Sequence, residues 1–413
     1  MNNTDKINII EGGVTAAKGY MAACTAAGIK YKGRTDMALV YSDVPCKTAA
    51  VYTSNIVKAA PVLWDKAITE SDQEVRAVVV NSGIANACTG EKGLAVCRAT
   101  GQAVADILGG EPESVLIGST GVIGMQIDTD KIVAGTKDLM QKKAYGIEAG
   151  TAASKAIMTT DTINKEIAVQ FELGGKTVTI GAMSKGSGMI HPNMCTMLCY
   201  VTSDVAMDKK LMQEALSYVV SDTFNMITVD GDTSTNDTLI LLANGLAENP
   251  VIKEKNDDYN LFCEALYFVC ESLAKKMAGD GEGASHLFEC KVINAVNKDD
   301  AKKMARSVVG SNLSKAAIYG RDANFGRFLC AMGYSGASFD QNDVQLYFVS
   351  KAGKLMVFDM GNPVDFDEEE AVRILSENDI TILVDMHEGD AEATAWGCDL
   401  TYDYVKINAD YRS

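Results

Sequence analysis

The chain has 413 residues, of which 47% are hydrophobic, and its formal net charge is −17. This length leaves room for two or three domains with a large core, whereas the negative charge argues against a nucleic-acid-binding surface and against binding to an anionic membrane. No run of about 18 uncharged apolar residues occurs, so no membrane span is expected. The N-terminus lacks the basic region and apolar core of a signal peptide, so we expect a cytoplasmic protein.

The chain contains eleven cysteines and three histidines, and their positions limit the disulfides, metal sites and histidine-based catalysis that it can contain. The cysteines are scattered and contain no CxxC pair, so neither a disulfide framework nor a metal site is expected. A Ser-His-Asp or Cys-His arrangement would have to use His191, His286 or His387. This scarcity favours a mechanism that needs no histidine base.

Two short apolar runs in the first third of the chain each lead into a polar loop. Residues 76–80 (RAVVV) are predicted to form a buried strand before 81–90 (NSGIANACTG), and 115–117 a second strand before 118–124 (GSTGVIG). Between them, 94–108 is predicted to be a helix. Functional side chains concentrate in loops that rigid strands hold, so the pattern predicts one site-bearing edge of a sheet.

A helix over 130–158 and a β-hairpin are expected next. Residues 167–173 and 176–181 flank Gly174-Gly175, which is a two-residue hairpin signal. The segment 185–200 (KGSGMIHPNMCTMLCY) then combines two glycines and a proline with an apolar run. Glycine and proline constrain the loop, and 196–202 is predicted to be a strand. A hydroxyl at its first position is well placed for chemistry, and an ordinary loop-to-strand junction is the alternative.

A helix over 209–226 with Asp208 as N-cap precedes the acidic loop 229–238 (VDGDTSTNDT). This loop lacks the spacing of an EF-hand, so its side chains are expected to hydrogen-bond the backbone. A strand over 239–242 and a helix over 259–277 follow. Residues 279–283 interleave three glycines with two carboxylates, which indicates a close approach of the backbone to another group.

The pattern changes after residue 286, where a second α+β domain is predicted. Its expected elements are a strand at 286–296, a helix at 299–309, a loop at 319–327, a hairpin at 344–358, a helix at 367–376, and strands near 380–386 and 400–408.

Several strings, in this order and spacing, resemble the glutamate N-acetyltransferase family of arginine biosynthesis, also called ornithine acetyltransferases. They are GVTAAKGYMAA (13–23), NSGIANACTG (81–90), STGVIG (119–124), MTTDT (158–162), KGSGMIHPNM (185–194), VDGDTSTNDT (229–238), DGEGASHL (280–287), GRDANFGR (320–327) and the terminal ATAWGCDLTYDYVKINADYRS. The resemblance implies an α+β fold. A layered α/β/β/α sandwich of the N-terminal-nucleophile kind would occupy 1–286, and a smaller C-terminal α+β domain, 287–413, would complete the substrate pocket.

The resemblance also implies that the chain cuts itself between Cys195 and Thr196. An α chain, 1–195, and a β chain from 196 would stay together, and two such pairs would form an α2β2 assembly. Three positions depart from the family pattern. Cys195 stands where alanine is usual, Ile84 where asparagine is frequent and Ser413 where threonine is commoner.

Residue roles follow from the same resemblance. Thr196 would be the nucleophile with its own α-amine as base, and Thr120 and Gly121 would form the oxyanion hole. The implied substrate-binding residues are Thr159, Lys185, Thr196, Glu282, Asn408 and Ser413. Lys185 suits a substrate α-carboxylate, and Glu282 suits the side-chain ammonium of ornithine. The implied reaction transfers an acetyl group from N2-acetyl-L-ornithine to L-glutamate through an acetyl-Thr196 intermediate, with no bound cofactor.

Three alternatives stay open from the sequence. Acetyl-CoA is either a second acetyl donor or not a substrate. An N-terminal-nucleophile aminopeptidase or amidase would use the same hydroxyl with water as acceptor. A non-catalytic binding protein would remain uncleaved.

Overall fold

The computed structural model describes residues 6–191 and 197–409. The chain forms two compact units, each with a mixed β-sheet. The first unit comprises Met1–Gly186, Asn193–Ser221 and Thr233–Leu273, and the second comprises Ser187–Pro192, Asp222–Asp232 and Ala274–Ser413. The sequence predicted a single boundary after residue 286. The predicted α+β class is confirmed.

The sheet of the first unit contains nine strands among the described residues. Their order is β1 (Asn8–Ile10), β6 (Lys165–Leu173), β7 (Lys176–Lys185), β8 (Leu198–Ser203), β10 (Thr238–Ala243), β3 (Met37–Tyr52), β4 (Val75–Asn81) and β5 (Val115–Ser119), with β2 (Tyr20–Thr25) also on β3. The predicted strands at 76–80, 115–117 and 239–242 and the hairpin around Gly174-Gly175 are therefore confirmed.

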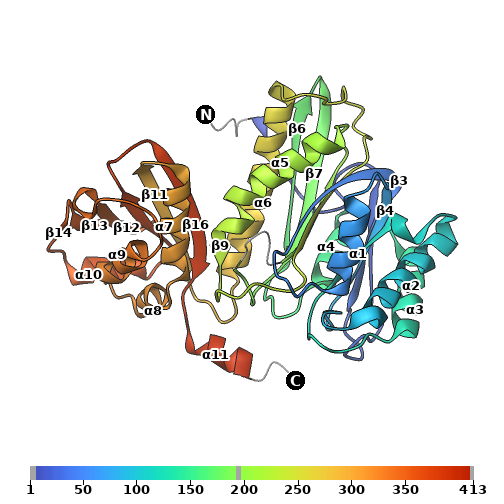
Figure 1. Ribbon diagram of the computed structural model, residues 1–413, viewed down its shortest axis with the longest axis horizontal. Helices are drawn as coiled ribbons and strands as arrows, with labels where there is room; N and C mark the ends of the chain where they lie inside the picture. Colours follow the sequence, from blue (N-terminus) through green and yellow to red (C-terminus); the bar gives the residue numbers. More distant parts are fainter. Residues whose placement is uncertain (1–5, 192–196, 410–413) are drawn as a thin grey trace. The chain divides into compact units, whose positions relative to one another are not determined.

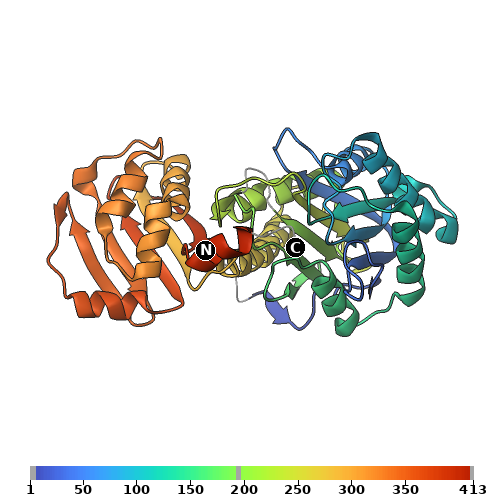
Figure 2. The same cartoon turned by 90° about the horizontal axis from the view of Figure 1, so that it is seen from below.

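Strand β3 lets this sheet fold over itself. Its first part pairs with β2 and β4, its second part pairs with β10, and the register shifts between Tyr41 and Cys46. The two layers meet face to face, because a Cβ added at Gly118 of β5 would lie 1.9 Å from the hydroxyl of Tyr200 of β8. Helices α2 (Gly90–Leu108) and α3 (Thr129–Lys142) lie on the opposite side of the strands from α5 (Lys209–Asp222) (Figures 1 and 2). The expected α/β/β/α order is confirmed.

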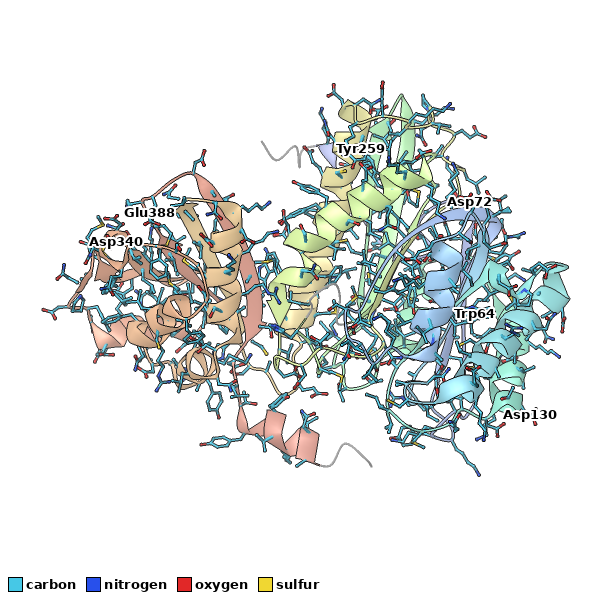
Figure 3. The ribbon with its side chains drawn as sticks, viewed as in Figure 1. Trp64, Asp72, Asp130, Tyr259, Asp340 and Glu388 are labelled. Atoms are coloured by element: carbon cyan, nitrogen blue, oxygen red, sulfur yellow. The ribbon has the colours of Figure 1, made fainter. Side chains whose placement is uncertain are left out.

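Side chains from helices cover two strand edges of this sheet. Trp64, labelled on α1 (Ala60–Thr69) in Figure 3, donates from Nε1 to the carbonyl of Val115 at 3.0 Å. Asp65 on the same helix accepts from the amide of Ile117 at 2.7 Å. The carboxamide of Gln213 on α5 likewise bonds both backbone groups of Ala50 at 3.0 Å. Paired edges are closed to other strands.

The second unit is built on a seven-stranded sheet among the described residues. Its order is β14 (Asn362–Pro363), β13 (Gly353–Asp359), β12 (Gln345–Ser350), β15 (Asp379–Asp385), β11 (Leu287–Ala295), β16 (Ala391–Cys398) and β9 (Ile227–Thr228). Helices α7 (Lys298–Gly310), α9 (Phe325–Gly333) and α10 (Glu368–Leu375) lie in front of it in Figure 1, and α8 (Asn312–Gly320) adjoins α7. The predicted elements at 286–296, 299–309, 344–358, 367–376 and 380–386 are confirmed.

Three sequence predictions are corrected here. The helix expected over 130–158 is two helices, α3 and α4 (Ile147–Ala156), because Ala144 pairs with the backbone of Ala22 and Gly146 takes a φ of +97°. The loop expected over 319–327 contains the end of α8 and the start of α9. The strand expected near 400–408 is helix α11 (Tyr402–Ala409), whose Tyr402 and Val405 are exposed and so bury no sheet face.

Helices α2, α5 and α6 (Asp257–Gly279) agree with the predictions, with shifted ends, whereas α1 was not predicted. Helix α2 begins four residues before Leu94, and α5 ends at Asp222, four residues before Met226. Short 3-10 turns occupy Pro112–Ser114, Phe224–Met226 and Gln341–Asp343. Asp208 accepts from the amide of Lys210 at 2.9 Å, as expected for the N-cap of α5. Within 6–191 and 197–409, no helix has the length and apolar character that crossing a membrane requires.

Candidate active site

The loops after β4 and β5 lie side by side, as the sequence predicted. The strands are parallel, with Asn81 opposite Ser119. The amide of Thr120 donates to the carbonyl of Asn81 at 3.0 Å, and the amide of Val122 donates to that of Gly83 at 3.1 Å. A Cβ added at Gly121 would lie 2.3 Å from the carbonyl carbon of Gly83, and the φ of Gly121 is +126°. Only glycine fits this position without strain.

Lys185, at the end of β7, directs its ammonium group to Thr120. Its Nζ donates to Thr120 Oγ1 at 3.3 Å, and its side chain is buried. A hydroxyl that accepts a hydrogen bond keeps its own hydrogen for another acceptor. The Thr120 hydroxyl is therefore able to donate to a further acceptor.

Asp161 connects the loop that contains Thr159 with the end of β7. One of its oxygens accepts from Lys165 Nζ at 2.7 Å and from the amide of Gly186 at 2.7 Å, and the other accepts from the amide of Thr159 at 3.1 Å. The side chains of Asp161 and Lys165 have no exposed surface. Burial raises the pKa of Asp161, but Lys185 and Lys165 lower it more, to about 2. Asp161 is thus an anion between two lysines.

The predicted cleavage residues, Cys195 and Thr196, lie outside the described residues. The chain that follows them is held in the sheet. Leu198 pairs in register with Lys185 of β7 and with Thr238 of β10. The carbonyl of Met197 also accepts from the amide of Thr238 at 2.8 Å. The strand predicted from 196 begins at Leu198 in the structure.

In the second unit, the structure brings two predicted substrate residues together. Asn408 of α11 donates to Glu282 at 2.7 Å, and the amide of Glu282 donates to the carbonyl of Ser187 at 3.0 Å. A Cβ added at Gly188 would lie 2.3 Å from a Glu282 carboxylate oxygen. The close approach predicted at 279–283 is present, because a Cβ added at Gly283 would lie 2.8 Å from the amide of Tyr404. The remaining predicted substrate residue, Ser413, lies outside the described part of the chain.

Ser285 and His286, which follow Glu282 closely in the sequence, contact Asp399 but do not form a catalytic triad with it. His286 Nδ1 lies 2.8 Å from Ser285 Oγ and 3.1 Å from Asp399 Oδ2, and Ser285 Oγ donates to Asp399. In a triad, the serine contacts Nε2 and the aspartate Nδ1. Burial raises the pKa of Asp399, but hydrogen bonds from His286 and Ser285 outweigh it, so the pKa is lowered. This network fixes the loop that contains Ser285 to the chain segment at Asp399.

The other two histidines are also engaged within the second unit. Nε2 of His191 accepts from Arg306 at 3.3 Å, and its Nδ1 lies 3.0 Å from Thr228 Oγ1. Burial and the nearby guanidinium lower the pKa of His191, so the ring is neutral at neutral pH. His387 Nδ1 lies 3.0 Å from the carbonyl of Asp343.

The described residues contain no group of three or more His, Cys, Asp or Glu side chains arranged to hold a metal ion. An open hollow of about 810 Å³ occurs in the second unit, where Figure 3 labels Asp340 and Glu388. Glu388 accepts there from the amide of Asp340 at 2.9 Å. None of the residues predicted to bind substrate lines this hollow.

Two residues of the site had no assigned role in the sequence. Asp161 belongs to the MTTDT string and Asn236 to the VDGDTSTNDT string. The side-chain nitrogen Nδ2 of Asn236 donates to the carbonyls of Ala85 and Ser119. This confirms that side chains of the acidic loop bond the backbone. The sequence offered one signal for these two residues, which is that both lie in strings that resemble those of the family.

Comparisons with known proteins agree on one family. The model of the ArgJ family matches residues 21–413. The arginine biosynthesis bifunctional protein ArgJ of Symbiobacterium thermophilum is 52% identical over 98% of this chain and 99% of its own length. The protein of that name from Bacillus subtilis is 45% identical over 99% of this chain and 98% of its own length.

Solved structures give similar identities over shorter spans. Ornithine acetyltransferase from Mycobacterium tuberculosis, solved in complex with ornithine, is 40% identical over 46% of this chain and all of that chain, with a TM-score of 0.42. The arginine biosynthesis bifunctional protein of Bacillus halodurans is 46% identical over 51% of this chain and 97% of that chain, with a TM-score of 0.49.

Proposed function

The chain belongs to the ArgJ family and is an acetyltransferase of arginine biosynthesis, and we propose that it transfers the acetyl group through an ester on Thr196. The donor is N2-acetyl-L-ornithine and the acceptor is L-glutamate. The observation that carries this proposal is the hydrogen bond from Lys185 to Thr120. Lys185 also pairs with Leu198, which follows Thr196 by two residues in the sequence.

Self-cleavage makes the nucleophile. Thr196 Oγ attacks the carbonyl of Cys195, and the C–N bond breaks as the acyl group moves to the oxygen, which frees the α-amine of Thr196. Water then hydrolyses this ester, leaving a carboxylate on Cys195 and the hydroxyl on Thr196. Its α-amine has a reference pKa of about 7.7–8.0 and can take the hydroxyl proton. A histidine base is then unnecessary. This suits a chain in which His191, His286 and His387 all make contacts within the second unit.

Acetyl transfer follows in two steps. Thr196 Oγ attacks the acetyl carbonyl, and the proton passes through the α-amine to the departing amine of ornithine. The α-amine of glutamate then attacks the ester and regenerates the Thr196 hydroxyl. Each step forms a tetrahedral oxyanion, for which Thr120 Oγ1 and the amide of Gly121 are the proposed donors.

The remaining residues bind the substrates in this proposal. Lys185 stabilises the developing charge through Thr120 and attracts the α-carboxylate. Glu282, held by Asn408, pairs with the side-chain ammonium of ornithine. Thr159 and Ser413 supply further polar contacts. The relatives are described as bifunctional, and acetyl-CoA is proposed as a second donor to the same Thr196.

Intact-mass measurement of the wild type beside Thr196→Ala tests the proposal. We expect two fragments in the wild type, the second beginning at Thr196, and one uncut chain in the variant. Cys195→Ala is the matched control, and it should be cut because alanine is equally small. A single chain in the wild type would remove the basis for Thr196 as the nucleophile.

Two assays then separate the alternatives. Transfer of labelled acetyl from N-acetylornithine to glutamate distinguishes the transferase from an amidase, which would release acetate at the same rate without glutamate. Replacing N-acetylornithine by acetyl-CoA shows whether the second donor is used. If glutamate is acetylated by N-acetylornithine but not by acetyl-CoA, the enzyme is monofunctional.

A further inference from the structure

The loop of Asn236 meets both loops of the candidate oxyanion hole. Asn236 lies just before β10 and is 7% exposed. Its Nδ2 donates to the carbonyl of Ala85 at 2.5 Å and to the carbonyl of Ser119 at 2.8 Å. Its Oδ1 accepts from Thr235 Oγ1 at 2.6 Å. Because both partners of Nδ2 are carbonyl oxygens, the orientation of the amide is determined.

The two carbonyls belong to different loops. Ala85 follows β4 and Ser119 ends β5, so one amide group joins the two segments. Further bonds support the same pairing. Ser119 Oγ donates to Asn81 Oδ1 at 2.7 Å, and the amide of Ala85 donates to the carbonyl of Val122 at 3.0 Å.

These bonds fix the backbone at Thr120. The Ser119 carbonyl and the Thr120 amide belong to one planar peptide. The carbonyl accepts from Asn236, and the amide donates to the carbonyl of Asn81 at 3.0 Å. The orientation of this peptide limits the direction of the next one, which carries the amide of Gly121.

An oxyanion hole works because its donors are in place before the charge develops. We propose that Asn236 is a positioning residue for acetyl transfer, which holds the Thr120 hydroxyl and the Gly121 amide in the orientation that the tetrahedral intermediate needs. This inference rests on the proposed role of Thr120 and Gly121. Asn236 acts through the Ala85 and Ser119 carbonyls without touching substrate.

Asn249 offers a matched control within the same unit. It is 5% exposed, and its Nδ2 also donates to two carbonyls, those of Ala206 at 3.2 Å and Pro250 at 2.9 Å. Its Oδ1 accepts from the amide of Ala206 at 2.8 Å. Truncation of either asparagine removes a buried amide with similar bonds, but only Asn236 bonds the loops after β4 and β5.

The test compares Asn236→Ala and Asn249→Ala in steady-state acetyl transfer, after intact mass has shown the processing state and thermal unfolding the fold. We expect Asn236→Ala to lower kcat about 10- to 100-fold, because a donor displaced by about 1 Å loses much of its effect. KM for both substrates should stay within about twofold. Asn249→Ala should lower the unfolding temperature comparably and leave kcat within about twofold.

A double-variant comparison with Thr120→Ala separates this inference from the proposed function. Thr120→Ala should lower kcat about 10²- to 10³-fold, and adding Asn236→Ala should lower it little further. Unchanged kcat in Asn236→Ala, with a large loss in Thr120→Ala, would overturn the positioning role alone. Unchanged kcat in Thr120→Ala would overturn the proposed oxyanion hole.

Thr235→Val covers the case in which Asn236→Ala does not fold. It removes only the hydrogen bond from Thr235 Oγ1 to Asn236 Oδ1. We expect a folded protein with kcat lowered about 3- to 10-fold and an unchanged KM. A folded Thr235→Val variant with wild-type kcat would contradict the inference.

Discussion

Two buried aspartates, Asp161 in the first unit and Asp399 in the second, fix loops by different means. Asp161 lies between Lys165 and Lys185 and also accepts from two backbone amides. The described partners of Asp399 are the side chains of His286 and Ser285 and the amides of both residues. The pKa is lowered in both aspartates, although burial by itself would raise it.

The difference lies in what a missing carboxylate leaves behind. Without Asp161, the ammonium of Lys165 stays buried and loses its charge partner, which is far more costly than an unpaired neutral donor. Without Asp399, the loop at Ser285 loses hydrogen bonds from two backbone amides and two side chains, but no buried lysine loses its charge partner. The first network therefore depends on both signs of charge, whereas the second should tolerate change better.

The largest expected effect is that of Asp161→Asn. The variant removes the negative charge that pairs with the buried Lys165, so the free energy of unfolding should fall by about 3–5 kcal/mol. Urea unfolding followed by circular dichroism measures it. The double variant Asp161→Leu/Lys165→Met removes both charges and should be more stable than the single variant. A double variant less stable than Asp161→Asn would contradict the ionic account.

Acid should remove the contribution of Asp161 over a defined range. The folded pKa of about 2 lies below the usual aspartate pKa of 3.8, so the stabilisation is present above pH 4 and is lost as the pH falls toward 2. The shift corresponds to about 2 kcal/mol. Urea midpoints measured at several pH values should therefore show a steeper acid loss in the wild type than in Asp161→Asn. Parallel curves for the two proteins would count against this assignment.

Asp399→Asn should lower the free energy of unfolding less, by about 1.5 kcal/mol, because it weakens hydrogen bonds to one carboxylate and leaves no buried lysine without its partner. The pKa of Asp399 is shifted downward, as is that of Asp161, so the stability that Asp399 contributes is also lost only in acid. Differential scanning calorimetry of Asp399→Asn beside Asp161→Asn checks the order. A larger loss in Asp399→Asn would reverse the comparison between the two networks.

Gly188→Ala should have the smallest effect on stability, about 1 kcal/mol, and a clear effect on binding. The added methyl group would meet the Glu282 carboxylate, which must weaken its hydrogen bond from Asn408 to move away. Displacing the proposed ammonium partner should raise KM for N-acetylornithine about tenfold, which corresponds to the loss of about one hydrogen bond to a charged group. Gly320→Ala, in α8 with open space around the position, is the control. An unchanged KM in Gly188→Ala would argue against the role of Glu282.

Much of the fold follows from local pattern. The β-branched run at 76–80 and the glycine pair at 174–175 identify β4 and the β6–β7 hairpin, because strand and turn signals lie within a few residues. The terminal segment misled the prediction. A strand was expected near 400–408, but Tyr402 and Val405 are exposed, and the segment is the helix α11.

The sequence by itself determined the family, the presence of two polar loops at one edge of a sheet, and the residues whose chemistry suits acetyl transfer. Only the tertiary structure placed Asn236 on Ser119 and Asp161 beside Lys185. Asn236 and Ser119 are 117 residues apart in the chain, and their contact exists because β3 passes from one layer of the folded sheet to the other. Local periodicity records which face of an element is buried, but not which distant element covers it.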